Sequence, residues 1–273
     1  MLVKYNSGSG AAAAQHDNQE HWGRSLGTAK EAMNSTKRTA RVAGALYLVN
    51  AVTGFFSIIY VPSRLVVPGN AAATAGNIMA SERLFRLGIA SEVICAVEFI
   101  YLLWVLYRLL SGASKTHASL MVIFGLAFVP IMCMNAVSDI AALTLLRGAE
   151  FLSVFDQPQR ETLAMLFLGV RGYGYGVGWI FGLWLLHFGV CVWKSRFLPR
   201  FLGVLLIAAC FGYLAVSLTP FLLPSYVNIV SRFANIALTL GEPAAILWLL
   251  IMGAKDQPLE AAPRVGGDVR IPT

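Results

Sequence analysis

Charged residues are scarce in this sequence. Only 13% of its 273 residues are Asp, Glu, Lys or Arg, whereas 57% are hydrophobic. A soluble domain carries about 25% charged residues, because water must solvate its surface. The shortage of charge therefore excludes an ordinary soluble protein and indicates a chain that lies in a lipid bilayer.

Cysteine and histidine are also few, and their spacing offers little chemistry. The four cysteines fall inside apolar stretches and form no Cys-x-x-Cys pair, which excludes a disulfide framework and a thioredoxin-type redox pair. The zinc-protease pattern His-Glu-x-x-His is absent. We expect His187 to be a boundary residue with no second membrane histidine opposite it. We therefore predict no metal site, and the sequence identifies neither a cofactor nor a catalytic residue.

The net charge is +7, but no basic patch interleaved with aromatic residues accompanies it. Nucleic-acid-binding proteins usually carry such a patch. Basic residues at the ends of apolar runs account for most of the charge. We predict a lipid bilayer as the partner of this chain, and no nucleic acid.

Long apolar runs are the main feature that is present. A helix needs about 20 apolar residues to cross roughly 30 Å of hydrocarbon, at about 1.5 Å per residue. Six such runs predict an all-α polytopic membrane protein with six transmembrane helices within residues 37–255. The runs extend approximately from Val42 to Tyr60, Leu84 to Tyr107, Leu120 to Leu146, Thr162 to Val192, Phe201 to Leu222 and Tyr226 to Met252.

Lys and Arg alternate between the two sides of these runs. Cytoplasmic loops retain positive charge, so the more basic side is expected to face the cytoplasm. Both termini fall on that side, and we expect residues 1–36 and 256–273 to be disordered cytoplasmic tails. The basic side holds Lys30, Lys37, Arg38, Arg41, Arg108, Lys115, Lys194, Arg196, Arg200, Lys255, Arg264 and Arg270.

The three spans that return to the cytoplasm end in related strings. These are EFIYLLWVL, GWIFGLWLL and EPAAILWLL, each with Leu-Trp-x-Leu at the same offset. The repeat indicates three helical hairpins in parallel orientation. The alternative is that Trp104, Trp184 and Trp248 only occupy the aromatic belt at one membrane interface.

The fourth span contains the glycine-rich string RGYGYGVGWIFGLWLL at residues 171–186. Gly174, Gly178 and Gly182 recur every four residues, and Gly172 and Gly176 repeat the interval on a neighbouring face. Small residues at this spacing let helices approach closely in lipid. A potassium-selectivity filter would need a non-helical Thr-Val-Gly-Tyr-Gly loop around a pore. We therefore predict a central packing helix.

The first outer loop carries a helix signal of its own. Asn70 precedes the string AAATAGNIMASERLF, and asparagine favours the first position of a helix. We expect a surface helix that covers the ends of the spans. The alternative is a lid over a binding site.

Charged residues also occur inside the apolar runs. Each costs about 2.5 to 3.5 kcal/mol at the centre of a bilayer, so those retained usually face protein or water and find partners. Glu92, Asp139, Arg171 and Arg232 fall in the outer half of their spans, and we expect them to meet in the bundle interior. The charged residues are Glu92, Glu98, Asp139, Arg171, Arg232 and Glu242.

Polar residues at helical spacing extend this expected cluster. Residues four apart share a helix face, as Asn135 does with Asp139 and Tyr175 does with Arg171. On the last span a polar stripe runs through residues 228, 232, 235, 239 and 242. The predicted ligand-binding residues are Glu92, Asn135, Asp139, Arg171, Tyr175, Arg232, Asn235 and Glu242.

These charges admit more than one function. We favour binding or transport of a small solute or a proton through a buried polar cluster open to the extracytoplasmic side. Glu98 and Glu242, which have no obvious cationic neighbour, are the candidates for binding protons. The alternatives are an intramembrane enzyme acting on a lipid or quinone, and a structural or regulatory subunit whose polar network only fixes helix register. The sequence does not decide whether the protein is an enzyme, nor its oligomeric state.

Three strings resemble a known family. VPGNAAATAGNIMASERLFRLGIASE, YGYGVGWIFGLWLL and KSRFLPRFLGVLLI, in this order, are similar to the bacterial membrane family named domain of unknown function 4386. The resemblance covers about Lys37 to Lys255. It implies a six-span bacterial inner-membrane protein, and it carries over no activity, cofactor or site residue.

Overall fold

The computed structural model describes residues 35–176 and 179–254. Within these ranges the chain forms helices joined by turns, and no strand occurs. The expected tails at residues 1–36 and 256–273 lie outside the described residues, apart from residues 35 and 36. The observed architecture confirms the prediction of an all-helical chain.

Five helices are long and apolar enough to cross a membrane. Each has at least 23 residues, which corresponds to about 34 Å of helix at about 1.5 Å per residue. This shows a protein suited to crossing the bilayer several times. The helices are Ser35–Leu65, Glu82–Leu110 (α4), Lys115–Arg147 (α5), Arg200–Leu222 (α8) and Pro224–Met252, which contains α9 (Val227–Leu247).

The apolar run predicted from Thr162 to Val192 is described as two helices. They are α6 (Gln157–Gly176) and α7 (Trp179–Lys194). Residues 177 and 178 lie between them and outside the described part of the chain. The structure therefore shows five candidate spans, and it does not show the predicted count of six.

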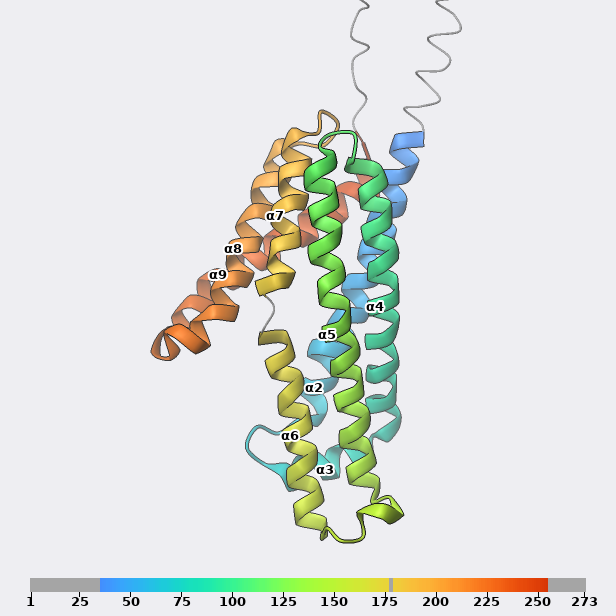
Figure 1. The fold of residues 1–273 in the computed structure, drawn as a ribbon, viewed down its shortest axis with the longest axis vertical. Coiled ribbons are helices and arrows are strands. Elements are labelled where there is room, and N and C mark those ends of the chain that lie inside the picture. The colour runs from blue at the N-terminus through green and yellow to red at the C-terminus, as the bar shows by residue number, and fades with distance from the viewer. Residues whose placement is uncertain (1–34, 177–178, 255–273) are drawn as a thin grey trace, which may run out of the picture.

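Helix α5 is the central element of the fold (Figure 1). It packs against α4 along its side, against α6 near one end and against α7 near the other. Helix α8 lies between α7 and α9. The described chain starts and finishes at the same end of the molecule, which is also the end of the turn between α4 and α5.

The opposite end is covered by short helices. The first long helix passes through a π-helical turn, Phe56–Tyr60, into α2 (Val61–Leu65). Helix α3 (Ala71–Ala80) follows, and the Asn70 side chain accepts a hydrogen bond from the Ala73 amide at 2.9 Å. This confirms the predicted capped helix. It packs mainly against α6 and buries Ile78, so it covers the ends of the longer helices.

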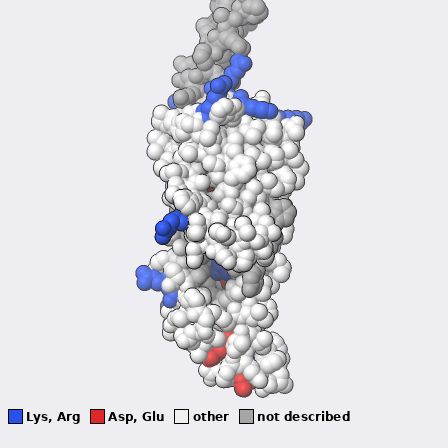
Figure 2. Space-filling model, turned by 90° about the vertical axis from the view of Figure 1, so that its left-hand side faces the viewer, with Lys and Arg blue, Asp and Glu red and all other residues white. Residues whose placement is uncertain are grey.

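The surface differs between the ends and the sides. Figure 2 shows Lys and Arg gathered at the upper end, acidic residues near the lower end, and a largely uncharged side between them. The basic end includes Lys37, Arg41, Lys194 and Arg196, which line two shallow hollows there. Large apolar side chains such as those of Val52, Ile123 and Ile236 are more than half exposed on the sides. Lipid tails suit such a surface.

Close glycine packing occurs at several helix contacts, including the one between α7 and α8. A Cβ atom added to Gly203 would lie 2.7 Å from the Gly189 carbonyl oxygen, and one on Gly182 would lie 3.2 Å from that of Cys210. The predicted packing role is thus confirmed for Gly182. It is wrong for Gly172, beside which a Cβ would meet nothing within 4 Å. Gly178 lies outside the described residues.

Candidate functional site

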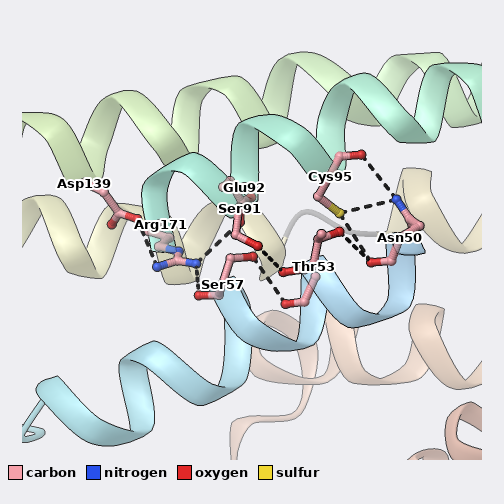
Figure 3. Close-up of polar contacts among 9 residues, drawn as sticks. Asn50, Thr53, Ser57, Ser91, Glu92, Cys95, Asp139 and Arg171 are labelled. Atoms are coloured by element: carbon pink, nitrogen blue, oxygen red, sulfur yellow. Dashed lines mark hydrogen bonds and ion pairs between the residues drawn. The ribbon is translucent and has the colours of Figure 1, made fainter. Parts of the chain in front are cut away.

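Arg171 on α6 lies at the centre of a buried ionic cluster. Its guanidinium is 3.0 Å from a carboxylate oxygen of Asp139 on α5 and 3.5 Å from one of Glu92 on α4. It also donates a hydrogen bond to the carbonyl oxygen of Ser57 in the first helix. Figure 3 shows these groups converging from four helices. The structure thus brings together three of the residues that the sequence predicted to meet.

The cluster is almost completely shielded from the surroundings. Glu92, Asp139 and Arg171 are 0%, 1% and 8% exposed, respectively. Burying a charged group costs several kcal/mol per ion. Only close ion pairing combined with hydrogen bonds offsets this cost. One cation faces two acids here, so the cluster carries one net negative charge when both acids are ionised.

Pro62 explains why a backbone carbonyl is available to Arg171. In the π-helical turn the Val61 amide donates to the carbonyl of Phe56, five residues earlier. The next donor in this register would be residue 62, but proline has no N–H. The carbonyl of Ser57 is therefore left for the guanidinium. This contact was not predicted from the sequence, in which Pro62 is its signal.

On α5, two buried polar atoms at or near the level of the cluster have no hydrogen-bond partner among the described residues. They are the second carboxylate oxygen of Asp139 and the side-chain nitrogen of Asn135, which is 2% exposed. Asn135 and Asp139 lie one turn apart on α5. Buried polar groups are normally satisfied, so this acceptor and this donor are suited to a bound molecule.

A cavity of about 410 Å³ adjoins the cluster. Arg171 is the only charged residue that lines it among the described residues. Figure 2 shows a hollow in the uncharged side of the molecule, with Lys or Arg atoms visible inside it. The apolar walls come from the first helix, α4 and α6, and include Ile58, Val61, Leu65, Phe85, Met165 and Leu168.

Polar contacts continue from the cluster along the first helix (Figure 3). The Ser91 hydroxyl donates to the Thr53 carbonyl at 3.0 Å, and the Asn50 side-chain amide donates to the Cys95 carbonyl at 3.2 Å. Glu98, one turn beyond Cys95, is 8% exposed and lies beside Asn50. The contacts therefore join the first helix to α4 well beyond the ionic cluster.

Glu242 belongs to a second, separate cluster. One carboxylate oxygen accepts a hydrogen bond from the Tyr47 hydroxyl at 2.5 Å, and the other accepts one from the Tyr213 hydroxyl at 2.7 Å. The three side chains come from the first helix, α8 and α9. Neither tyrosine was predicted from the sequence, because tyrosine in an apolar run is equally expected at a membrane interface.

Two predicted members of the ionic cluster lie elsewhere. Arg232 and Asn235 are exposed on α9, whose main packing partner is α8. The prediction that Arg232 joins Asp139 and Arg171 is therefore wrong. The side chain of Tyr175 lies outside what the structure describes, so its place in the site stays a prediction.

The expectation that His187 has no histidine opposite it is also wrong. Its Nδ1 atom lies 3.1 Å from that of His117, near the start of α5. The His187 ring also stacks on Phe124, with the ring centres 5.4 Å apart. His117 precedes Asp139 by 22 residues, about 33 Å along α5 at about 1.5 Å per residue, so this pair is remote from the ionic cluster. The described residues contain no group of three potential metal ligands.

The fold and the site define a multi-pass helical membrane protein with a buried ionic cluster beside an apolar cavity. Residues 42–253 match the family described as "Domain of unknown function (DUF4386)", and the chain belongs to that family. The resemblance seen in the sequence is thus confirmed. No curated protein and no solved structure matches the chain.

Proposed function

We propose that the protein binds a small molecule in the cavity beside Arg171 and that this binding is a step in its transport. The observation that carries the proposal is the apolar cavity of about 410 Å³ that is lined by Arg171, whose guanidinium contacts two buried acids. Ligand sites are typically clefts of about 300 to 1,000 Å³, mostly apolar, with a few placed polar groups that fix orientation. The cavity has this character.

The same proposal includes an orientation in the bacterial inner membrane. Helices α6 and α7 together form a sixth span in it, and the basic end of the molecule faces the cytoplasm. The cavity then opens on the extracytoplasmic half of the protein. The matching distribution of Lys and Arg in Figure 2 supports this orientation.

A purely structural network is the main alternative, and two observations weigh against it. A network that only fixes helix register has no need of an adjoining cavity. It also has no need of unsatisfied polar atoms, yet Asp139 and Asn135 each present one. Such atoms are costly without a partner, by about 1 to 3 kcal/mol each.

The test is ligand-dependent stabilisation of the purified full-length protein. A molecule that binds only the native state raises its apparent stability, by about 2.7 kcal/mol when its concentration is a hundred times the dissociation constant. We expect at least one member of a panel of metabolites and lipids to raise the unfolding temperature, and Arg171→Lys to weaken that effect. If no member stabilises the protein, the network is structural. Flux into liposomes then separates transport from binding alone.

A further inference from the structure

The walls of the cavity restrict the chemistry of its ligand. The side chains that line it are apolar, apart from that of Arg171. A hydrophilic solute would lose its hydrogen bonds to water at these walls, at a cost of about 1 to 3 kcal/mol for each polar group left without a partner. The body of a fitting ligand is therefore apolar, and it presents one polar group toward Arg171.

The charges of the cluster restrict that polar group further. Glu92 and Asp139 hold the guanidinium and outnumber it when both are ionised, so they already offset the positive charge that Arg171 would offer to an anion in the cavity. A cation meets Arg171 first, since neither acid lines the cavity. Coulomb interactions are strong in a low-dielectric site, where water does not screen them. An uncharged oxygen group avoids both penalties.

The position of the cavity indicates how such a ligand arrives. Figure 2 shows the hollow on the side of the molecule, between the basic upper end and the acidic lower end, in a surface that carries few charged residues. Ile58 in its wall is 37% exposed, and Leu166 on the adjacent α6 surface is 59% exposed. An apolar surface of this kind faces lipid in a membrane protein. Entry from the bilayer needs no passage through water.

Resting on the proposed function, we infer that the ligand is a neutral, membrane-soluble molecule with an apolar body and a carbonyl or hydroxyl oxygen. The body occupies the space between the first helix and α6, and the oxygen accepts a hydrogen bond from Arg171. Quinones and lipid alcohols are the two sources of this chemistry.

Probes that share one alkyl tail test this class. We would measure the unfolding temperature of the full-length protein in lipid nanodiscs with decanol, decylubiquinone, decanoate and decylamine, and with glycerol as a hydrophilic probe. We expect saturable stabilisation by decanol, decylubiquinone or both, and none by the two charged probes or by glycerol. Which neutral probe binds more tightly separates a hydroxyl from a carbonyl ligand.

Two glycines that line the cavity provide test variants, and a glycine outside the cavity provides their matched control. A Cβ atom added to Gly169 or Gly172 meets nothing within 4 Å, so Gly169→Leu and Gly172→Leu fill the cavity without a backbone clash. Gly76 on α3 is a helical glycine with equally open surroundings, but it does not line the cavity. We expect either filled-cavity variant to lose at least tenfold in probe affinity and Gly76→Leu to retain it.

The possible results test the neutral class of the ligand, its place in the cavity and the proposed function separately. Stronger stabilisation by decanoate, decylamine or glycerol, lost in Gly169→Leu, would overturn the neutral class and leave the proposed function standing. Equal stabilisation of Gly169→Leu and Gly76→Leu by the neutral probes would overturn the inference, because the effect would then come from the bilayer. The proposed function fails separately, if no molecule of any class stabilises the protein.

Discussion

At the scale of single residues, Arg171 holds the site together. It contacts two buried acids, and it also binds a backbone carbonyl. The three contacts come from three helices other than its own. Loss of the guanidinium therefore affects more groups than loss of either acid.

Substitutions of this ion pair should be unequal and non-additive. Arg171→Met strands both Asp139 and Glu92, which should cost about 3 to 5 kcal/mol of the free energy of unfolding. Asp139→Leu should cost less, since Glu92 and the Ser57 carbonyl still hold Arg171. The double variant should be less harmful than the sum of both. Equilibrium unfolding in detergent, arranged as a double-mutant cycle, measures the coupling.

Thr144→Val, on the same helix as Asp139, is the control for that cycle. The Thr144 hydroxyl bonds only to the carbonyl of Ile140, within its own helix. We expect a change below about 0.5 kcal/mol, as for surface substitutions in general. Strictly additive losses for Arg171→Met and Asp139→Leu would contradict the contact described here.

The tyrosines around Glu242 give a second prediction at this scale. Tyr47→Phe keeps the ring that packs against Trp184 but removes the hydroxyl that binds Glu242. Because a buried polar group left without its hydrogen-bond partner costs about 1 to 3 kcal/mol, the variant should lose a similar amount of stability. Tyr101→Phe, on an exposed face of α4, should change nothing measurable. Equal unfolding temperatures for the two variants would rule out a structural role for the Tyr47 hydroxyl.

At the scale of helices, the sequence predicts where the helices occur better than it predicts which helices pack against each other. The apolar runs matched the five long helices within several residues, because bilayer thickness sets their minimum length. The polar stripe on α9 shows the limit. Periodicity places Arg232 and Asn235 on one face, but it does not reveal that α8 covers only part of α9 and leaves both exposed. The contact among Glu92, Asp139 and Arg171 was predictable, because a charged side chain inside a membrane needs a partner of opposite charge.

The contact between α7 and α8 yields a prediction about packing. In Gly203→Ala the new Cβ would lie 2.7 Å from the Gly189 carbonyl oxygen, so the two helices must move apart. Overpacking of this kind costs about 1 to 3 kcal/mol. Gly76→Ala meets no atom within 4 Å and should instead gain about 0.5 to 1 kcal/mol, because alanine favours a helix. Thermal unfolding of both variants checks the signs, and a stable Gly203→Ala would contradict the close approach.

At the scale of the whole molecule, charge and connectivity agree. The described chain begins and ends at one end, and the turn between α4 and α5 lies there too. The same end carries the gathered Lys and Arg residues in Figure 2. An even number of crossings returns a chain to its starting side, which is why we propose α6 and α7 as a sixth span.

Reporter fusions test this arrangement directly. Alkaline phosphatase, which is active only outside the cytoplasm, should be active when fused after Val61, Glu150 or Pro224. It should be inactive after Ser114, Lys194 or Lys255. Expression of each fusion, measured by immunoblot, is the control. Activity after Lys194 combined with inactivity after Glu150 would reverse the orientation.

The contact between Arg171 and the Ser57 carbonyl affects how genetic data on this site should be interpreted. The acceptor is a main-chain atom, so replacing Ser57 by any other residue leaves it in place. Ser57 is completely buried, so a mutational scan would score position 57 as tolerant of small residues such as alanine. The sensitivity would shift to position 62, where any residue but proline restores an N–H that competes for the carbonyl. Tolerance at one position and intolerance five residues later would be the genetic signature of a binding group that no side chain encodes.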